Sequence, residues 1–332
     1  MRRARFLGSL AVVAVALTGC RGDDAGDRRM ADDQRMAAEP YWAQPDTLFV
    51  PVIAPTDAKS VSRTSMWVAD PEFGAVFNFA PGEDKYVALG SGDREPTQIR
   101  IPAKLALSPE IGLSVYDGET QSIDLFTTGG EFIRGFEIEF TPAVMEFTSA
   151  PIGYVFAIAS SDYEGQPRVV IIQTDALGGA RDTLLSPDVG PAALQGAMAT
   201  PGETLITSSG RGLWVWSRAA PDSVYEVATR SARTVRVRVE DRSAVGLMGD
   251  PTRDMLWFAH VQPDSASYSA YDTQAGVTKT FLGTRTTPGG LSPRLVHDGI
   301  LMGWSRGQQT MVAVSYDLNA DELVRQELAA GD

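Results

Sequence analysis

From about residue 46 onward, apolar residues recur in short alternating runs, and helical periodicity is almost absent. Gly, Pro, Asp and Ser separate these runs, a pattern typical of strands joined by turns. The clearest unit covers residues 101–138, which contain the four runs AKLALS, GLSVYD, SIDLFT and EFIRGFEI. Because short turns join the runs, the unit predicts a four-stranded antiparallel meander.

The second run of this unit has counterparts along the chain, with starts 41 to 51 residues apart. These second-strand segments are SMWVAD (65–70), GLSVYD (112–117), GYVFAIAS (153–160), ETLITSS (203–209), DMLWFAH (254–260) and GILMGWS (299–305). Six units of about 47 residues therefore fill 46–332. A repeating four-stranded unit of this length predicts an all-β fold, a six-bladed β-propeller of four-stranded antiparallel blades. A β-sandwich is the alternative, but it would not need six similar units.

Closure of the ring has two alternatives at this stage. The segment TLFVPVIA (47–54) is either the first strand of blade one or a clasp beside ELVRQEL (322–328). The sequence does not choose between them.

Residues 101–138 resemble an NHL repeat. The likeness rests on a proline, a small-apolar strand, the tripeptide VYD, an Ile-x-x-Phe strand from Ile123 to Phe126, and a last strand that follows glycine. NHL repeats have Asn and Arg between the positions of Asp117 and Ile123, where this chain has GETQS. The resemblance, NHL- or TolB-like, implies a six-bladed propeller.

The N-terminus has the layout of an export signal. Arg2, Arg3 and Arg5 precede an apolar run over 6–17, which is shorter than the roughly 20 residues that span a bilayer. The run ends in LTGC, which resembles the lipobox of bacterial lipoproteins. That resemblance implies cleavage before Cys20 and acylation of its sulfur and its new amine. The alternative is an ordinary signal peptide with a chance cysteine.

Three segments follow from these patterns: a lipoprotein signal peptide (1–19), a flexible charged tether (20–45) and the propeller (46–332). The predicted location is the cell envelope, where membrane lipid would hold the protein through acylated Cys20. Arg21 occupies the position where aspartate favours inner-membrane retention in well-known Gram-negative lipoproteins. The outer membrane or periplasmic face is therefore favoured over the inner membrane.

Charge and cysteine content exclude several functions. The formal net charge is −13, and removal of 1–19, with three arginines and no acids, makes it −16. Such an acidic chain is not expected to bind nucleic acid. Cys20 is the only cysteine, so once it is acylated the chain has no thiol for a disulfide or a thiolate site.

Two sets of polar residues are candidate binding sites. Turns after second strands and links between blades share one face of a propeller. The candidates there are Asp93, Arg94, Glu95, Asp162, Tyr163 and Glu164, with Arg211 and Arg306 opposite. The second set is the basic stripe in TRSARTVRVRVEDR (229–242), where Arg233, Arg236 and Arg238 could bind an anion. The alternative for both sets is ordinary solvated turns and a solvated strand face.

Other motifs do not predict catalysis. GWSRG (303–307) matches G-x-S-x-G, but no histidine follows Ser305, and the segment is expected to occupy the turn between two blade strands. His260 and His297, both expected at strand ends in equivalent regions of adjacent units, belong to no HExxH motif. Sugar-lactonase-like propellers use asparagine at an axial metal, and this chain has only Asn78 and Asn319. No metal site and no cofactor are predicted.

The leading functional hypothesis is a lipid-anchored binding or scaffold module for an envelope protein or a polar ligand. The alternative is a propeller hydrolase or lyase with a carboxylate or metal site on the axis. A third hypothesis is binding of a small anion by the arginine stripe. The sequence identifies neither the ligand nor the oligomeric state.

Overall fold

A computed structural model describes the chain between residues 46 and 318, with gaps. The described residues are 46–49, 54–62, 65–79, 87–89, 99–108, 111–138, 143–150, 153–161, 164–208, 212–221, 223–228, 231–235, 244–262, 265–273, 281–288, 291–306 and 311–318. Cys20 and the predicted signal peptide and tether lie outside them.

The strands pair into six antiparallel sheets of four strands each, and five of the sheets are continuous in the sequence. The first sheet contains β2 (Asp57–Ser62), β3 (Ser65–Asp70), β4 (Ala75–Phe79) and β5 (Val87–Leu89). The second contains β6 (Pro102–Ser108), β7 (Gly112–Asp117), β8 (Ser122–Phe126) and β9 (Phe132–Glu137). The third contains β10 (Ala143–Ala150), β11 (Gly153–Ser161), β12 (Pro167–Thr174) and β13 (Ala180–Leu185).

The other sheets follow the same order of strands, after a short helical link. The link contains α2 (Ala192–Met198) and the 3-10 helix η1 (Pro201–Glu203). The fourth sheet contains β14 (Thr204–Ser208), β15 (Gly212–Ser217), β16 (Val224–Ala228) and β17 (Ser231–Val235). The fifth contains β18 (Gly246–Asp250), β19 (Met255–Val261), β20 (Ser265–Asp272) and β21 (Phe281–Pro288). The sixth contains β22 (Leu291–His297), β23 (Ile300–Arg306), β24 (Met311–Asp317) and β1 (Asp46–Phe49).

The position of β1 excludes the first of the two alternatives for ring closure, in which the N-terminal segment begins blade one. β1 is antiparallel to β24, with Asp46 opposite Ser315 and Phe49 opposite Val312. The N-terminal strand therefore completes the last sheet, and the first sheet begins with β2. Residues 322–328, the partner considered for a clasp, lie outside the described residues.

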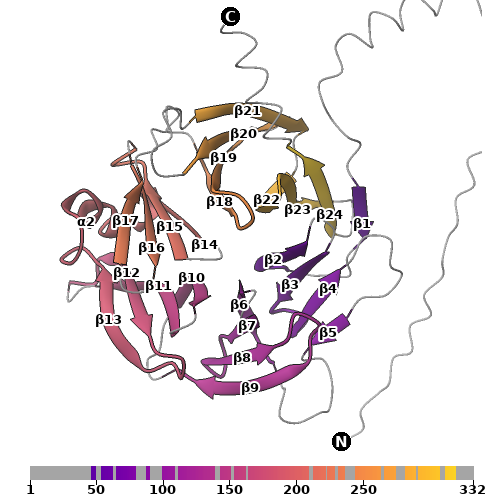
Figure 1. Cartoon of the computed structure of the whole chain (residues 1–332), viewed down its shortest axis with the longest axis horizontal. Helices are drawn as coiled ribbons and strands as arrows, with labels where there is room; N and C mark the ends of the chain where they lie inside the picture. The colour runs from indigo at the N-terminus through magenta and orange to yellow at the C-terminus, as the bar shows by residue number, and fades with distance from the viewer. Residues whose placement is uncertain are drawn as a thin grey trace, which may run out of the picture. The chain divides into compact units, whose positions relative to one another are not determined.

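Apolar clusters join each sheet to the next, which explains why the sheets form a ring (Figure 1). Trp67 and Leu105 belong to the cluster between the first and second sheets. Corresponding clusters follow between all later neighbours, and Phe77 and Leu295 belong to the one that joins the sixth sheet to the first. Each sheet thus buries both faces against its neighbours, as a propeller requires. The predicted propeller fold with four-stranded antiparallel blades is confirmed.

An aspartate at the end of the second strand fixes the turn that follows it. The Asp117 carboxylate accepts hydrogen bonds from the backbone N–H groups of Glu119 and Thr120, and also from Arg100 in the segment before β6. Asp70 accepts in the same way from Glu72 and from Phe73. The aspartates of SMWVAD and GLSVYD therefore cap turns, because buried backbone donors need acceptors.

Three details of the sequence interpretation are wrong. ETLITSS was assigned to a second strand, but residues 204–208 form β14, the first strand of its sheet. His260 lies within β19, a second strand, whereas His297 ends β22, a first strand, so the two positions are not equivalent. Ser305 lies in β23 and not in a turn.

The tryptophans whose side chains the structure describes are buried. Trp67, Trp216 and Trp257 are among the largest fully buried side chains, and Trp214 is buried with them. They pack between sheets and form no stacking surface.

Candidate functional site

The first strands of the six sheets surround a cavity of about 550 Å³. Each sheet contributes residues of its first strand: β2, β6, β10, β14, β18 and β22. Neighbouring first strands contact one another round the ring, including β2 with β22. The cavity therefore lies at the axis of the ring, and its size is typical of a small-molecule site.

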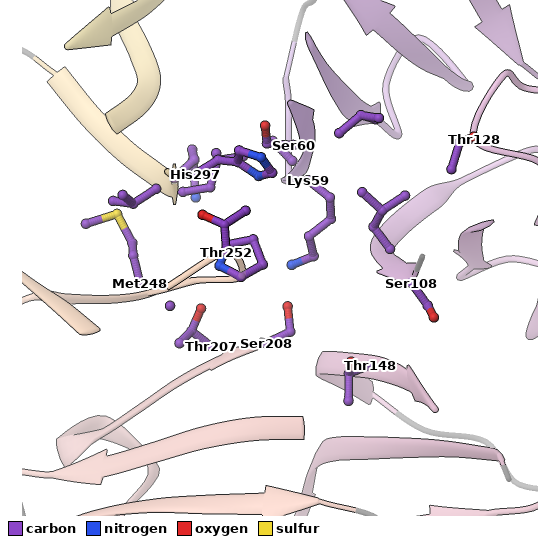
Figure 2. Close-up of a pocket in the computed structure, with 18 residues that line it drawn as sticks. Lys59, Ser60, Ser108, Thr128, Thr148, Thr207, Ser208, Met248, Thr252 and His297 are labelled. Carbon is purple, nitrogen blue, oxygen red and sulfur yellow. The ribbon is translucent and has the colours of Figure 1, made fainter. Parts of the chain in front are cut away.

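The lining combines apolar, hydroxyl and basic side chains (Figure 2). The apolar lining residues are Ala58, Val61, Leu107, Met248, Pro251, Leu295 and Val296. The hydroxyl residues are Ser60, Ser108, Thr128, Thr148, Thr207, Ser208 and Thr252. The basic residues are Lys59, Arg294 and His297. No carboxylate is among the lining residues that the structure describes.

Lys59 is the central charged residue of the site. Its Nζ lies 3.4 Å from Oδ1 of Asp57 and 3.1 Å from Oε1 of Glu146, and all three side chains are largely buried. Lys59 and Asp57 belong to β2, whereas Glu146 belongs to β10, two sheets further round the ring. The ion pairs therefore connect first strands that are not neighbours.

Backbone donors hold the two carboxylates in place. Asp57 accepts from the N–H of Ala58 at 2.8 Å and, through its other oxygen, from the N–H of Leu105 in β6 at 2.8 Å. Glu146 Oε1 accepts from the N–H of Phe147 at 3.2 Å. The group of Asp57, Lys59 and Glu146, called here the axial triad, thus ties together the first three sheets.

Burial and neighbouring charges together change the pKa values of Lys59 and Glu146. Burial lowers the pKa of Lys59, but the carboxylates of Asp57 and Glu146 outweigh it and raise that pKa above its ordinary value. Burial raises the pKa of Glu146, with a further contribution from the charge of Asp57 and opposing contributions from Lys59 and Lys104. Lys59 is therefore a charged donor at neutral pH and not a nucleophilic amine.

β-Bulges shape the first strands around the cavity. The pairing register shifts between Val144 and Glu146 in β10 and between Pro293 and Leu295 in β22. Bulges also interrupt β2 and β6. A bulge changes the direction of nearby side chains and is frequent next to functional sites. At β22 it coincides with Arg294, which lines the cavity.

Two turns beside the cavity are fixed to each other. The Asp250 carboxylate accepts from the N–H of Asp298 at 2.9 Å and from the N–H of Gly299 at 2.8 Å. Arg253 Nη2 lies 2.8 Å from Oδ1 of Asp298. Thr252, between Asp250 and Arg253, lines the cavity. Because these contacts join the fifth and sixth sheets, this part of the wall is preorganised.

The binding residues expected from the sequence are not among the described residues that line the cavity. Glu164 is exposed in the link from β11 to β12, Arg233 lies in β17 opposite Glu226, and Arg306 ends β23. Residues outside the described ranges are Asp93, Arg94, Glu95, Asp162, Tyr163, Arg211, Arg236 and Arg238. A shared site for these residues stays a prediction.

Sequence reasoning missed the axial triad, although a signal existed. The chain has only four lysines, and Lys59 follows Asp57 by two residues inside a predicted blade. Glu146 interrupts the otherwise uncharged strand AVMEFTSA. Charged side chains in the first strand of a blade are candidates for the axis, because that strand lies innermost.

Comparison with known proteins gives structural neighbours only. No protein-family model matches the chain, and no curated protein matches it. Virginiamycin B lyase from Staphylococcus aureus is 12% identical with a TM-score of 0.47, covering 82% of this chain and 99% of that one. A protein from Bacteroides fragilis is 9% identical with a TM-score of 0.47, and the match covers 84% of this chain and 96% of that one. The Cps50 (Swd1) β-propeller domain of Myceliophteria thermophila is 11% identical with a TM-score of 0.44, and the match covers 82% of this chain and 99% of that one. At this level of identity no function is transferred to the chain.

The described residues contain no group of three or more His, Cys, Asp or Glu residues placed to hold a metal ion. Among the same residues, no helix is long and apolar enough to cross a membrane.

Proposed function

We propose that this protein is an envelope-anchored binding module that takes a small molecule into the cavity at the axis of its β-propeller. In this proposal the six sheets are six blades of one ring. The cavity is the observation that carries the proposal, because every sheet contributes to it and its volume of about 550 Å³ suits a small ligand.

The pairing of the acidic residues favours binding over the alternative of an axial hydrolase or lyase. Asp57 and Glu146 are the carboxylates that contact Lys59, and both accept backbone hydrogen bonds. A general acid or base needs to reach the substrate. These carboxylates instead hold Lys59, which lines the cavity as a hydrogen-bond donor.

Lipid anchoring is the second part of the proposal. It rests on the basic N-terminus, the short apolar run and LTGC ending at Cys20. Cleavage before Cys20 would leave a charged tether over 20–45 and the propeller over 46–332. Incorporation of a clickable fatty acid by expressing cells tests the anchor. We expect label on the wild-type chain and none on Cys20→Ser, and equal labelling of both would refute lipidation at this residue.

A pair of matched substitutions tests the binding site. Thr207 lines the cavity, whereas Thr183 is exposed on β13, the outermost strand of the third sheet. Ligand-observed NMR with a library of small metabolites would identify compounds that bind the purified full-length chain. We expect Thr207→Trp to abolish their binding and Thr183→Trp to leave it unchanged.

The proposal fails if Thr207→Trp is folded by circular dichroism and still binds the same compounds with unchanged affinity. It also fails if no compound binds while envelope extracts yield a stoichiometric protein partner. That second result would support the scaffold hypothesis, with binding at the rim of the ring.

A further inference from the structure

The charge of the cavity lining differs from the charge of the chain. The protein has 42 acidic and 29 basic residues, excluding histidine. Among the described lining residues, however, the ionisable ones are Lys59, Arg294 and His297, all of them basic. A cavity with this lining in an acidic protein is suited to a ligand with negative charge.

Lys59 has hydrogen-bonding capacity that the axial triad does not use. An ammonium group has three N–H donors. The contacts with Asp57 and Glu146 account for two of them. Figure 2 shows the amino group of Lys59 directed into the middle of the cavity, toward the side where Thr207 and Ser208 lie. The third donor can therefore meet an acceptor oxygen of a molecule bound in the cavity, which Thr207 and Ser208 also line.

The carboxylates of the triad do not cancel this preference. Lys104 of β6 acts electrostatically on Glu146, so two lysines accompany the two acids. Asp57 and Glu146 are also stabilised by backbone N–H groups. Neither carboxylate is among the described lining residues, and Arg294 adds positive charge at the wall.

The rest of the wall is suited to an apolar body. Leu107, Met248 and Leu295 approach the cavity from three different sheets. A ligand that contacts them and also Lys59 needs a charged head group and a hydrocarbon portion. Two of the three Lys59 donors are directed to Asp57 and Glu146, so Lys59 has one donor for a head group. A single donor with hydroxyl groups in the same lining suits a monoanionic head group better than a dianionic phosphate.

We propose that the axial cavity binds a small organic carboxylate, with its head group on Lys59 and the hydroxyls of Thr207 and Ser208. The apolar part of the ligand lies against Leu107, Met248 and Leu295. This inference rests on the proposed function, since it assigns a ligand class to the same cavity.

Three probes with one hydrocarbon body and different head groups test the assignment: 2-naphthoate, 2-naphthylmethanol and 2-naphthylmethylammonium. Isothermal titration calorimetry with the purified full-length chain gives their dissociation constants. We expect the carboxylate to bind about 10-fold or more tightly than the alcohol, because hydrogen bonds to charged groups are the stronger ones. We expect the ammonium probe to bind more weakly than both.

Two variants connect the preference to the proposed head-group site. Lys59→Met combined with Glu146→Gln removes one positive and one negative charge together, and Asp57 keeps its backbone donors. We expect this double variant to bind the carboxylate and the alcohol within about 3-fold of each other. Ser208→Ala leaves the triad intact and decides the question if the double variant does not fold. For it we expect about a 3- to 10-fold loss for the carboxylate.

The outcomes separate the two proposals. If library compounds bind in the cavity but none of the three probes binds the wild-type chain at millimolar concentration, the carboxylate assignment is wrong and the axial binding function stands. If neither the library nor the probes yield a binder, the axial binding function itself is contradicted. If the alcohol or the ammonium probe binds as tightly as the carboxylate, and Thr207→Trp blocks it, the cavity is a binding site but the carboxylate assignment is wrong. An unchanged carboxylate preference in folded Lys59→Met/Glu146→Gln also overturns the role of Lys59.

Discussion

Replacing Lys59 with methionine tests whether the axial triad stabilises the ring. The change keeps most of the apolar length of the side chain but leaves Asp57 and Glu146 without their shared cation. The three side chains are only 10% to 16% exposed, so solvent cannot stabilise the two carboxylates that remain without a cation. Removing one partner of a buried ion pair costs about 3–5 kcal/mol. We expect the free energy of unfolding at pH 7 to fall by about 3 kcal/mol, at the lower end because backbone N–H groups also stabilise both carboxylates.

The pH dependence of this loss of stability follows from the directions in which the pKa values of Lys59 and Glu146 are changed. Lys59 has a raised pKa, so its stabilisation is fully present below the ordinary value of 10.5 and is lost as the pH rises through the folded-state value. Glu146 also has a raised pKa, so its ionised form costs stability, and this cost is relieved as the pH falls toward 4.5. Loss of Lys59 raises the pKa of Glu146 further. The deficit of the variant should therefore shrink as the pH is lowered.

Urea unfolding followed by circular dichroism, at several pH values from 5 to 8, measures this deficit. Arg100→Met is the matched control, because Arg100 pairs with Glu119 at 3.0 Å with both side chains about half exposed. Exposed pairs contribute about 0–1 kcal/mol, so the control should stay near wild type at every pH. A Lys59→Met deficit below about 1 kcal/mol, or one that grows on acidification, would refute the reasoning.

Three further predictions concern single elements. Burial, and then the charge of Asp117, raise the pKa of Asp124 to about 6. The ionised carboxylate therefore costs stability at pH 8 but not at pH 4. Asp124→Asn should raise the free energy of unfolding by about 1–2 kcal/mol at pH 8 and leave it unchanged at pH 4. Gly112 has φ +96°, and a Cβ there would overlap the Phe126 carbonyl oxygen, so Gly112→Ala should cost about 3 kcal/mol in thermal or urea unfolding. Gly165→Ala, at φ +80° in open space, is its control at about 1 kcal/mol. Deleting Asp46–Phe49 should lower the melting temperature, because β24 then pairs with β23 alone, and an unchanged value would contradict closure by β1.

Periodicity predicted the blades well where the turns are short. The four runs in residues 101–138 correspond to β6, β7, β8 and β9, because alternation and glycine-rich turns are local properties of the sequence. The fourth unit was shifted by one strand, since α2 and η1 lengthen the link before β14. Spacing between units alone cannot separate a longer link from an additional strand.

The axial site could not be assembled from the sequence, because its residues come from segments between 58 and 297. Their proximity depends on the radial packing of the sheets and on the bulges in β10 and β22. The sequence interpretation instead favoured charged turns, since polar residues in loops are visible without a three-dimensional arrangement. Lys59 and Glu146 were visible only as charged residues within strands.

The most direct test of the central claim is a crystal structure of the mature chain in complex with 2-naphthoate. The account predicts density for the probe in the axial cavity, with its carboxylate within hydrogen-bond distance of Lys59 Nζ and its rings against Leu107, Met248 and Leu295. A cavity that contains only water at saturating probe concentration, or a probe bound solely outside the ring of first strands, would contradict it.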